Sequence, residues 1–216
     1  MRPVAPPVHE FAGTYTVKGT TPAGEEYSGT MQIERKGTFL HAAADLGALG
    51  TRYGLAIPFS GRLVMAFGEK DKVEIGAYLL EGKTVHGLWV PPGAADADYG
   101  NCGYEESVAD APGVWTIRSA IAIDGSKYHG TVRLDPPAWA TSAVRPTVVK
   151  MTWNLHDGDY HSFGLAYEDA VYATFNLAAG QPNGVAVYAI GGDALDGVWI
   201  AGGQDDLGTE TLRRTS

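Results

Sequence analysis

The chain has 216 residues, 44% of them hydrophobic, and no apolar run approaches the roughly 18 residues that a membrane-spanning helix needs. Its 16 Lys and Arg residues are scattered and outnumbered by 25 Asp and Glu residues, and the resulting net charge of -9 argues against nucleic-acid binding. Cys102 is the single cysteine, which excludes an intramolecular disulfide and a cysteine-based metal site. We therefore expect a soluble protein with no nucleic-acid partner and no membrane span.

The N-terminal segment, residues 1–10, is a proline-rich lead without an apolar run of signal-peptide length. This pattern fits a cytoplasmic protein, and it equally fits a periplasmic or extracellular protein from which a signal peptide has been removed. The sequence does not choose between these compartments, and it leaves the oligomeric state open.

The remainder of the chain is a tandem repeat, in which the second half repeats the sequence pattern of the first. Residues 13–18 match residues 113–118 in a pattern of Gly, an aromatic residue, Thr, a β-branched residue and a base. Residues 27–30 match 128–131, and residues 53–56 match 163–166. The strongest match places four residues of 74–90 in register with four of 184–200, each pair 110 positions apart: Tyr78 with Tyr188, Gly82 with Gly192, Gly87 with Gly197 and Trp89 with Trp199.

Between these anchors the segments are short, alternate in polarity and are bounded by Gly, Asp and Pro, which predicts strands and hairpins. Each half supplies roughly seven or eight strands, the number at which an antiparallel meander closes into a barrel. We predict an all-β protein of two tandem barrels, the first over residues 11–108 and the second over residues 109–216. The alternative is one larger merged barrel with internal pseudo-twofold symmetry.

These anchors, with residues 208–212 (Gly-Thr-Glu-Thr-Leu), resemble a bacterial family of small repeat proteins that mostly lack an assigned function and are sometimes labelled fibronectin-binding. The layout is similar to that of calycin barrels, the class of lipocalins and avidins, which bind small molecules inside a closed meander. The resemblance implies a ligand-binding fold. Its motifs are turn glycines and core aromatics, so it carries over no catalytic residue.

Alternation along the strands predicts which side chains face inward. In the second half Val149, Met151 and Trp153 lie on one apolar face, and the repeat aligns Ala42 and Ala44 with Met151 and Trp153. The small alanines predict a ligand pocket in the first barrel and a filled core in the second. We expect this pocket to be lined by Tyr15, Ala42, Ala44, Arg52, Tyr53, Tyr78 and Trp89.

The hairpin around Asp157 allows two registers. A three-residue loop, residues 157–159, pairs Trp153 with Phe163 and puts His161 on the core face at the barrel rim. A two-residue turn at residues 157–158 would instead gather side chains that suit zinc or iron on one surface, namely Asn154, His156, Asp159 and His161. We favour the first register because the second exposes Phe163, and we expect neither a metal nor a cofactor.

No nucleophile elbow, His-Glu-x-x-His pair or phosphate-binding glycine loop occurs in the chain. The favoured hypothesis is therefore a barrel that binds a small apolar or aromatic molecule. One alternative is a cofactor-independent lyase, isomerase or cyclase, with His161 as its acid or base. Another alternative, taken from the resemblance, is a surface adhesion module.

Overall fold

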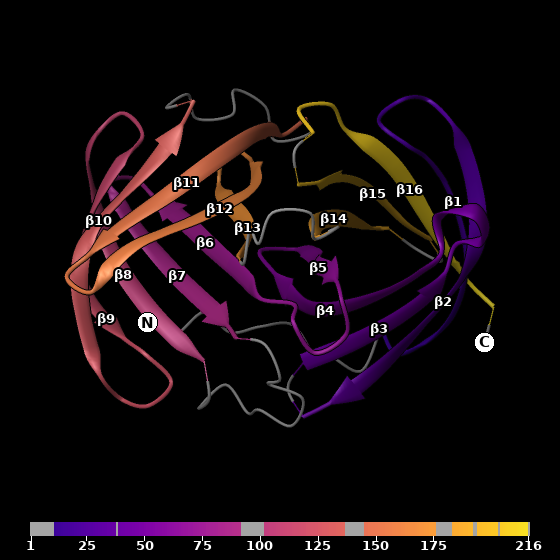
Figure 1. Ribbon diagram of the computed structural model, residues 1–216, viewed down its shortest axis with the longest axis horizontal. Helices are drawn as coiled ribbons and strands as arrows, with labels where there is room; N and C mark the ends of the chain where they lie inside the picture. The colour runs from indigo at the N-terminus through magenta and orange to yellow at the C-terminus, as the bar shows by residue number, and fades with distance from the viewer. Residues whose placement is uncertain are drawn as a thin grey trace.

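The computed structural model describes residues 11–37, 39–91, 102–136, 145–175, 183–191, 194–202 and 204–215. Within these ranges the chain forms 16 strands and one short 3-10 helix, Gly47–Leu49. The strands close into two antiparallel barrels of eight strands each (Figure 1). The predicted all-β fold with two closed barrels is confirmed, and the alternative of one merged barrel is wrong. The predicted lead, residues 1–10, lies outside the described residues.

Each barrel combines strands from both sequence repeats, and we name them for their place in the chain. The terminal barrel contains β1 (Gly13–Thr20), β2 (Glu26–Lys36), β3 (Phe39–Asp45), β4 (Thr51–Phe59), β5 (Arg62–Gly68), β14 (Gly184–Gly191), β15 (Ala194–Ala201) and β16 (Gly208–Arg214). The central barrel contains β6 (Ile75–Glu81), β7 (Thr84–Val90), β8 (Gly103–Ala111), β9 (Val114–Ile121), β10 (Lys127–Asp135), β11 (Thr147–Leu155), β12 (Gly158–Ala166) and β13 (Ala170–Phe175). In Figure 1 the terminal barrel accordingly carries both the indigo and the yellow end of the colour scale.

The two barrels have the same circular strand order when every strand is matched with the one eight places later. In both, five strands of one repeat close with the last three strands of the other repeat. Each repeat therefore places its last three strands in the barrel of the other repeat: β14–β16 close with β1–β5, and β6–β8 close with β9–β13. Domain-swapped dimers exchange segments between two molecules in the same way. The predicted division at residues 108 and 109 follows the repeats but not the barrels, and it falls inside β8. Equivalent strands carry similar residues, so the sequence alone does not reveal which copy pairs with which.

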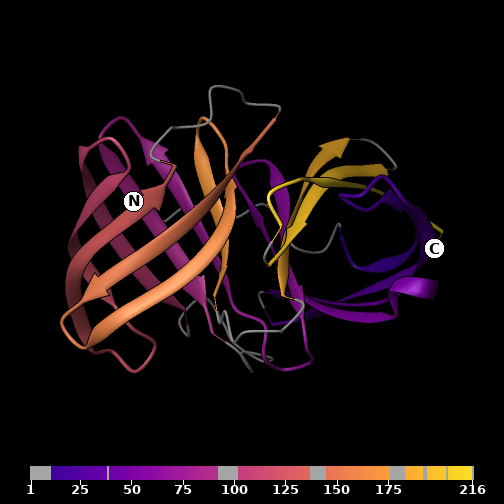
Figure 2. The same cartoon turned by 45° about the horizontal axis from the view of Figure 1, so that its top comes forward.

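A third apolar core joins the barrels, in addition to the two barrel interiors. It is built by the outward faces of strands such as β5 and β14 on the terminal side and β12 and β13 on the central side. Figure 2 shows the two barrels side by side, with these strands between them. Arg62 of β5 crosses this boundary and forms a salt bridge with Asp169, with Nη1 3.0 Å from Oδ1.

The core between the barrels explains why the predicted β11–β12 register is wrong. Phe163, Leu165 and Tyr167 are buried there, not inside the central barrel. The hairpin has a two-residue turn at His156 and Asp157, which pairs Leu155 with Gly158. Trp153 therefore lies opposite Tyr160, and His161 lies opposite Thr152 instead of Leu155. The apolar alternation of β12 predicts an inward face, but this face points outward and is apolar because it packs on the other barrel.

Candidate functional site

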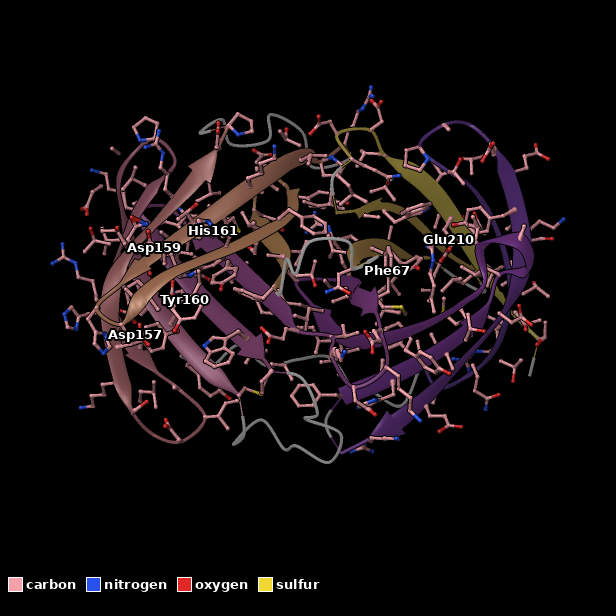
Figure 3. The ribbon with its side chains drawn as sticks, in the orientation of Figure 1. Phe67, Asp157, Asp159, Tyr160, His161 and Glu210 are labelled. Carbon is pink, nitrogen blue, oxygen red and sulfur yellow. The ribbon has the colours of Figure 1, made fainter. Side chains whose placement is uncertain are left out.

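A large cavity lies in the central barrel, at the end formed by the β11–β12 hairpin. Its volume is about 770 Å³, within the range of typical small-molecule sites. Polar and charged residues surround its mouth, and Figure 3 shows Asp157, Asp159, Tyr160 and His161 grouped there. Six aromatic side chains line it: Tyr78, Trp89, Tyr128, Trp153, Tyr160 and Phe175. We call this cavity the central pocket.

The packing of the barrel fixes the aromatic walls of the central pocket. Trp153 lies on the inward face of β11, and its ring centroid lies 4.9 Å from that of Phe175 and 6.0 Å from that of Tyr78. Trp89 packs over Gly103, where a Cβ atom would collide with the indole ring. The indole Nε1 of Trp89 donates a hydrogen bond to the Tyr128 hydroxyl at 3.1 Å. The walls are therefore positioned before any ligand arrives.

A buried carboxylate stands behind this wall. Glu105 is 4% exposed, accepts a hydrogen bond from Ser107 at 2.8 Å and accepts a longer one, 3.4 Å, from the Tyr128 hydroxyl. Burial raises the pKa of Glu105 to about 7, although hydrogen bonds from Ser107, Trp153 and Tyr128 oppose this shift. At neutral pH the group is thus poised between its acid and its base form, and Tyr128 connects it with the pocket.

The interior of the terminal barrel, where the sequence predicted a pocket, is nearly full. Its cavity measures about 20 Å³, room for about one water molecule. Ala42 and Ala44 do face this interior, but the side chain of Arg52 occupies the space that they leave. The guanidinium lies 4.9 Å from the ring centroids of both Phe67 and Trp199. The prediction that the first barrel holds the pocket and the second is filled is therefore wrong.

The predicted lining residues are divided between three places because of the strand exchange. Tyr15, Ala42, Ala44 and Arg52 belong to the interior of the terminal barrel, where the Tyr15 hydroxyl donates to the Phe11 carbonyl at 2.8 Å. Tyr78 and Trp89 line the central pocket. Tyr53 is 36% exposed on the outer side of β4, and it borders both the small terminal cavity and a second cavity next to it.

The residues predicted for catalysis or metal binding lie on the hairpin at the mouth of the central pocket. His161 shares the outer face of the barrel with Thr152, and its Nδ1 lies 3.2 Å from the Thr152 hydroxyl. Asn154 pairs with Asp159, while His156 stands in the turn and stacks on His129. Among the described residues, no group of three or more His, Cys, Asp or Glu side chains is arranged to hold a metal ion.

Strand pairing shows which residues of the two barrels are equivalent. Ala44 pairs with Arg52 in the terminal barrel, and Trp153 pairs with Tyr160 in the central barrel. Arg52 and Tyr160 are therefore equivalent residues. The sequence alignment of residues 53–56 with 163–166 would instead match Arg52 with Ser162, two residues further along β12. By the same ladders, three further residues of the terminal barrel match three of the central one: Phe67 with Phe175, Trp199 with Trp89, and Glu210 with Glu105.

Sequence reasoning missed the pocket residues Tyr128, Trp153, Tyr160 and Phe175, and it missed Glu105 behind the pocket wall. One signal was present: a glutamate stands at the same place in both repeats, two residues after Gly103 and after Gly208. On a strand this glutamate shares its face with those glycines, so a repeated inward carboxylate was readable from the alternation. Nothing in the sequence shows that the neighbours of this carboxylate come from the other repeat.

Comparisons with known proteins add little to this geometry. No family model and no curated protein sequence matches the chain. Among solved structures, a redesigned β barrel is 11% identical over 81% of this chain and 97% of its own, with a TM-score of 0.19. A TM-score this low supports no argument about fold or function, so the resemblance to a bacterial calycin-like family stays a prediction. None of the helices in the described part of the chain is long and apolar enough to cross a membrane.

Proposed function

We propose that the protein binds a small organic molecule in the central pocket. The observation that carries this proposal is the contrast between the barrels, since the same fold is closed by Arg52 in one and leaves about 770 Å³ open in the other. Aromatic walls offer a large apolar contact area, and the polar mouth would orient the ligand.

The test uses N-phenyl-1-naphthylamine, a neutral aromatic probe whose fluorescence rises in apolar sites. We expect saturable binding at one site per chain. Ala122 lines the pocket, so Ala122→Trp should obstruct it and weaken binding at least about tenfold. The control is Ala189→Trp, which makes the same change at an exposed position of the terminal barrel. Equal binding by both variants would place the probe outside the pocket and contradict the proposal.

A second candidate, an enzyme without a cofactor, is favoured by one observation. Glu105, with its pKa raised to about 7 by burial, contacts a pocket residue through the Tyr128 hydroxyl. Such a pair would move a proton to or from a bound substrate, as a lyase, isomerase or cyclase requires. His161 lies at the mouth with its ring beside Thr152 on the outer face of the hairpin, so Glu105 replaces it as the residue to test.

Proton transfer is measurable without knowledge of the natural substrate. Acetophenone in deuterated water exchanges its methyl protons when a base removes them, and NMR follows the exchange. An enzyme of this class should accelerate exchange above the buffer rate, and Glu105→Gln should abolish the acceleration while His161→Ala retains it. Binding of the naphthylamine probe without any acceleration would leave the protein as a binder.

A further inference from the structure

The terminal barrel carries a cation of its own in the place that corresponds to the central pocket. The guanidinium of Arg52 lies over Phe67 and Trp199, at a distance typical of cation–π contacts. It shares its small cavity with Glu210, which accepts hydrogen bonds from Tyr27 at 2.7 Å and from Tyr188 at 2.5 Å. Figure 3 shows Phe67 and Glu210 inside this barrel. The barrel thus contains a complete cation site, occupied by its own side chain.

The central barrel keeps the parts of this site that would surround a cation. Phe175 and Trp89 stand at the positions of Phe67 and Trp199, and both line the pocket. Glu105 stands at the position of Glu210 and is buried in the same way. Trp153, in the place of Ala44, adds another aromatic ring, 4.9 Å from Phe175.

The cation itself is missing from this second copy of the site. Tyr160 occupies the position of Arg52, and a phenol carries no positive charge. Its hydroxyl donates a hydrogen bond to Asp157 Oδ2 at 3.0 Å, and the side chain is 48% exposed at the mouth of the pocket. Tyr160 therefore leans towards the rim and leaves the interior open, whereas Arg52 fills its barrel.

The charges around the central pocket favour a positive ligand. Glu74, Asp157 and Asp159 contribute three carboxylates, and Lys127 contributes the one lysine or arginine among the pocket residues of the described chain. An anion would meet this excess negative charge, and a cation would be attracted by it and by the faces of the aromatic rings.

We propose that the central pocket binds an organic cation, with its charged head near Trp89 and Phe175, where Arg52 places its guanidinium in the other barrel. This inference rests on the proposed binding function and specifies the charge of the ligand. An amidinium, guanidinium or substituted ammonium group on an aromatic or apolar body has the required chemistry. The terminal barrel supplies the template, because its own cation already binds the equivalent residues.

The probes are benzamidine, benzamide and benzoate, which share a benzene ring and differ in the charge of a planar head group. Ligand-observed NMR titrations at neutral pH and low salt would compare their affinities. We expect benzamidine to bind at least about tenfold more tightly than benzamide, and benzoate to bind more weakly than either.

Variants then locate the cation. Tyr160→Arg puts an arginine in the central barrel at the position of Arg52. Its guanidinium should occupy the cation site and lower the affinity for benzamidine at least about tenfold. Tyr53→Arg is the matched control, since it makes the same change at an exposed tyrosine of the terminal barrel, and it should retain binding within about threefold. Asp157→Asn offers a second route if Tyr160→Arg folds poorly, because it should weaken benzamidine and leave benzamide unchanged.

The outcomes separate this inference from the function on which it rests. Equal affinity for benzamidine and benzamide, both reduced by Ala122→Trp, would overturn the cationic ligand and keep the pocket as a binding site. Benzamidine binding that neither Tyr160→Arg nor Asp157→Asn weakens would place the cation elsewhere and overturn the inference. Absence of binding by all three probes and by the naphthylamine probe would overturn both proposals.

Discussion

Glu105 and Glu210 are equivalent buried carboxylates in the two barrels, and they have different neighbours. Glu210 shares its cavity with the guanidinium of Arg52 and accepts hydrogen bonds from Tyr27 and Tyr188. The groups that hydrogen-bond Glu105 are all neutral, and its pKa rises to about 7 through burial. The same fold therefore offers one carboxylate a fixed cation and leaves the other ready to accept a proton or a ligand's charge.

The raised pKa of Glu105 makes a prediction about stability. Its ordinary pKa is 4.5, so between about pH 4.5 and pH 7 the unfolded chain releases a proton that the folded chain retains. Stability contributed by this group is therefore highest below about pH 4.5 and falls as the pH rises to about 7. Relative to Glu105→Gln, the wild type should lose on the order of 3 kcal/mol across this window, as measured by urea unfolding.

The matched control for this measurement is Glu106→Gln, an exposed carboxylate on the opposite face of the same strand. The pH dependence measured for Glu105→Gln is compared with that of Glu106→Gln under the same conditions. A flat difference for Glu105→Gln would show that the Glu105 pKa is the same in the folded and the unfolded chain, and it would contradict the raised pKa.

The filled terminal barrel predicts that Ala44→Trp destabilises the protein. Arg52, Phe67 and Trp199 occupy the space that a tryptophan at Ala44 would need, and the remaining cavity is about 20 Å³. Overpacking of this kind should lower the unfolding free energy by about 1–3 kcal/mol. Ala43→Trp, the same change on the outward face of β3, should cost within about 0.5 kcal/mol. Unchanged stability of Ala44→Trp would mean that Arg52 leaves the barrel easily.

The sequence predicted the strands, the repeat and the inward faces of β3 and β11 because these depend on local alternation. Leu40, Ala42 and Ala44 face the terminal interior, and Met151 and Trp153 face the central interior. Local alternation says which residues share a face, but it does not say what covers that face. The outward apolar face of β12 was consequently assigned to the barrel interior, which moved Arg52 out of alignment with Tyr160.

The sequence predicts some of the residues that line the pocket, but it does not predict which strands come together to form it. Tyr78 and Trp89 were expected to line a pocket, and they do line one. Their partners Trp153 and Phe175 come from the other repeat, so a search within residues 11–108 does not find them. The strand exchange is a long-range property, and the similarity of the repeats hides it from the sequence.

The contact between the barrels gives a third prediction, at Arg62 and Asp169. The Arg62 guanidinium lies over the Tyr167 ring and donates to both Asp169 oxygens at 3.0 Å, and the arginine side chain is 16% exposed. Asp169→Asn removes the charge partner of a largely buried arginine and should cost about 1–3 kcal/mol of unfolding free energy.

An exposed ion pair provides the comparison for Asp169→Asn. Lys72 and Glu69 lie 2.8 Å apart and are about half exposed, so Glu69→Gln should change stability by less than about 0.5 kcal/mol. Equal effects of the two substitutions would mean that the pair between the barrels adds no more than a surface pair does.

The strand exchange itself is testable by a disulfide between β1 and β16. Thr20 and Thr209 are paired across these strands, and their hydroxyl oxygens are 2.8 Å apart. Paired residues in antiparallel strands have Cα atoms about 4.5–5.5 Å apart, which suits a disulfide. We expect Thr20→Cys/Thr209→Cys to form an intramolecular bond on mild oxidation. The native Cys102 is buried, which raises its thiol pKa to about 12 and keeps it unreactive.

The control pairs Thr20 with the counterpart of Thr209 in the first repeat. If each repeat closed on itself, β1 would lie beside β8, and Thr20 would face Tyr104. Thr20→Cys/Tyr104→Cys should therefore stay reduced within the monomer, as mass spectrometry and a non-reducing gel would show. The Thr20–Thr209 bond would close a loop of 189 residues and should raise the unfolding free energy by about 2–5 kcal/mol. A bond that formed only in the control would assign each barrel to a single repeat and remove Trp153 and Phe175 from the neighbourhood of Trp89.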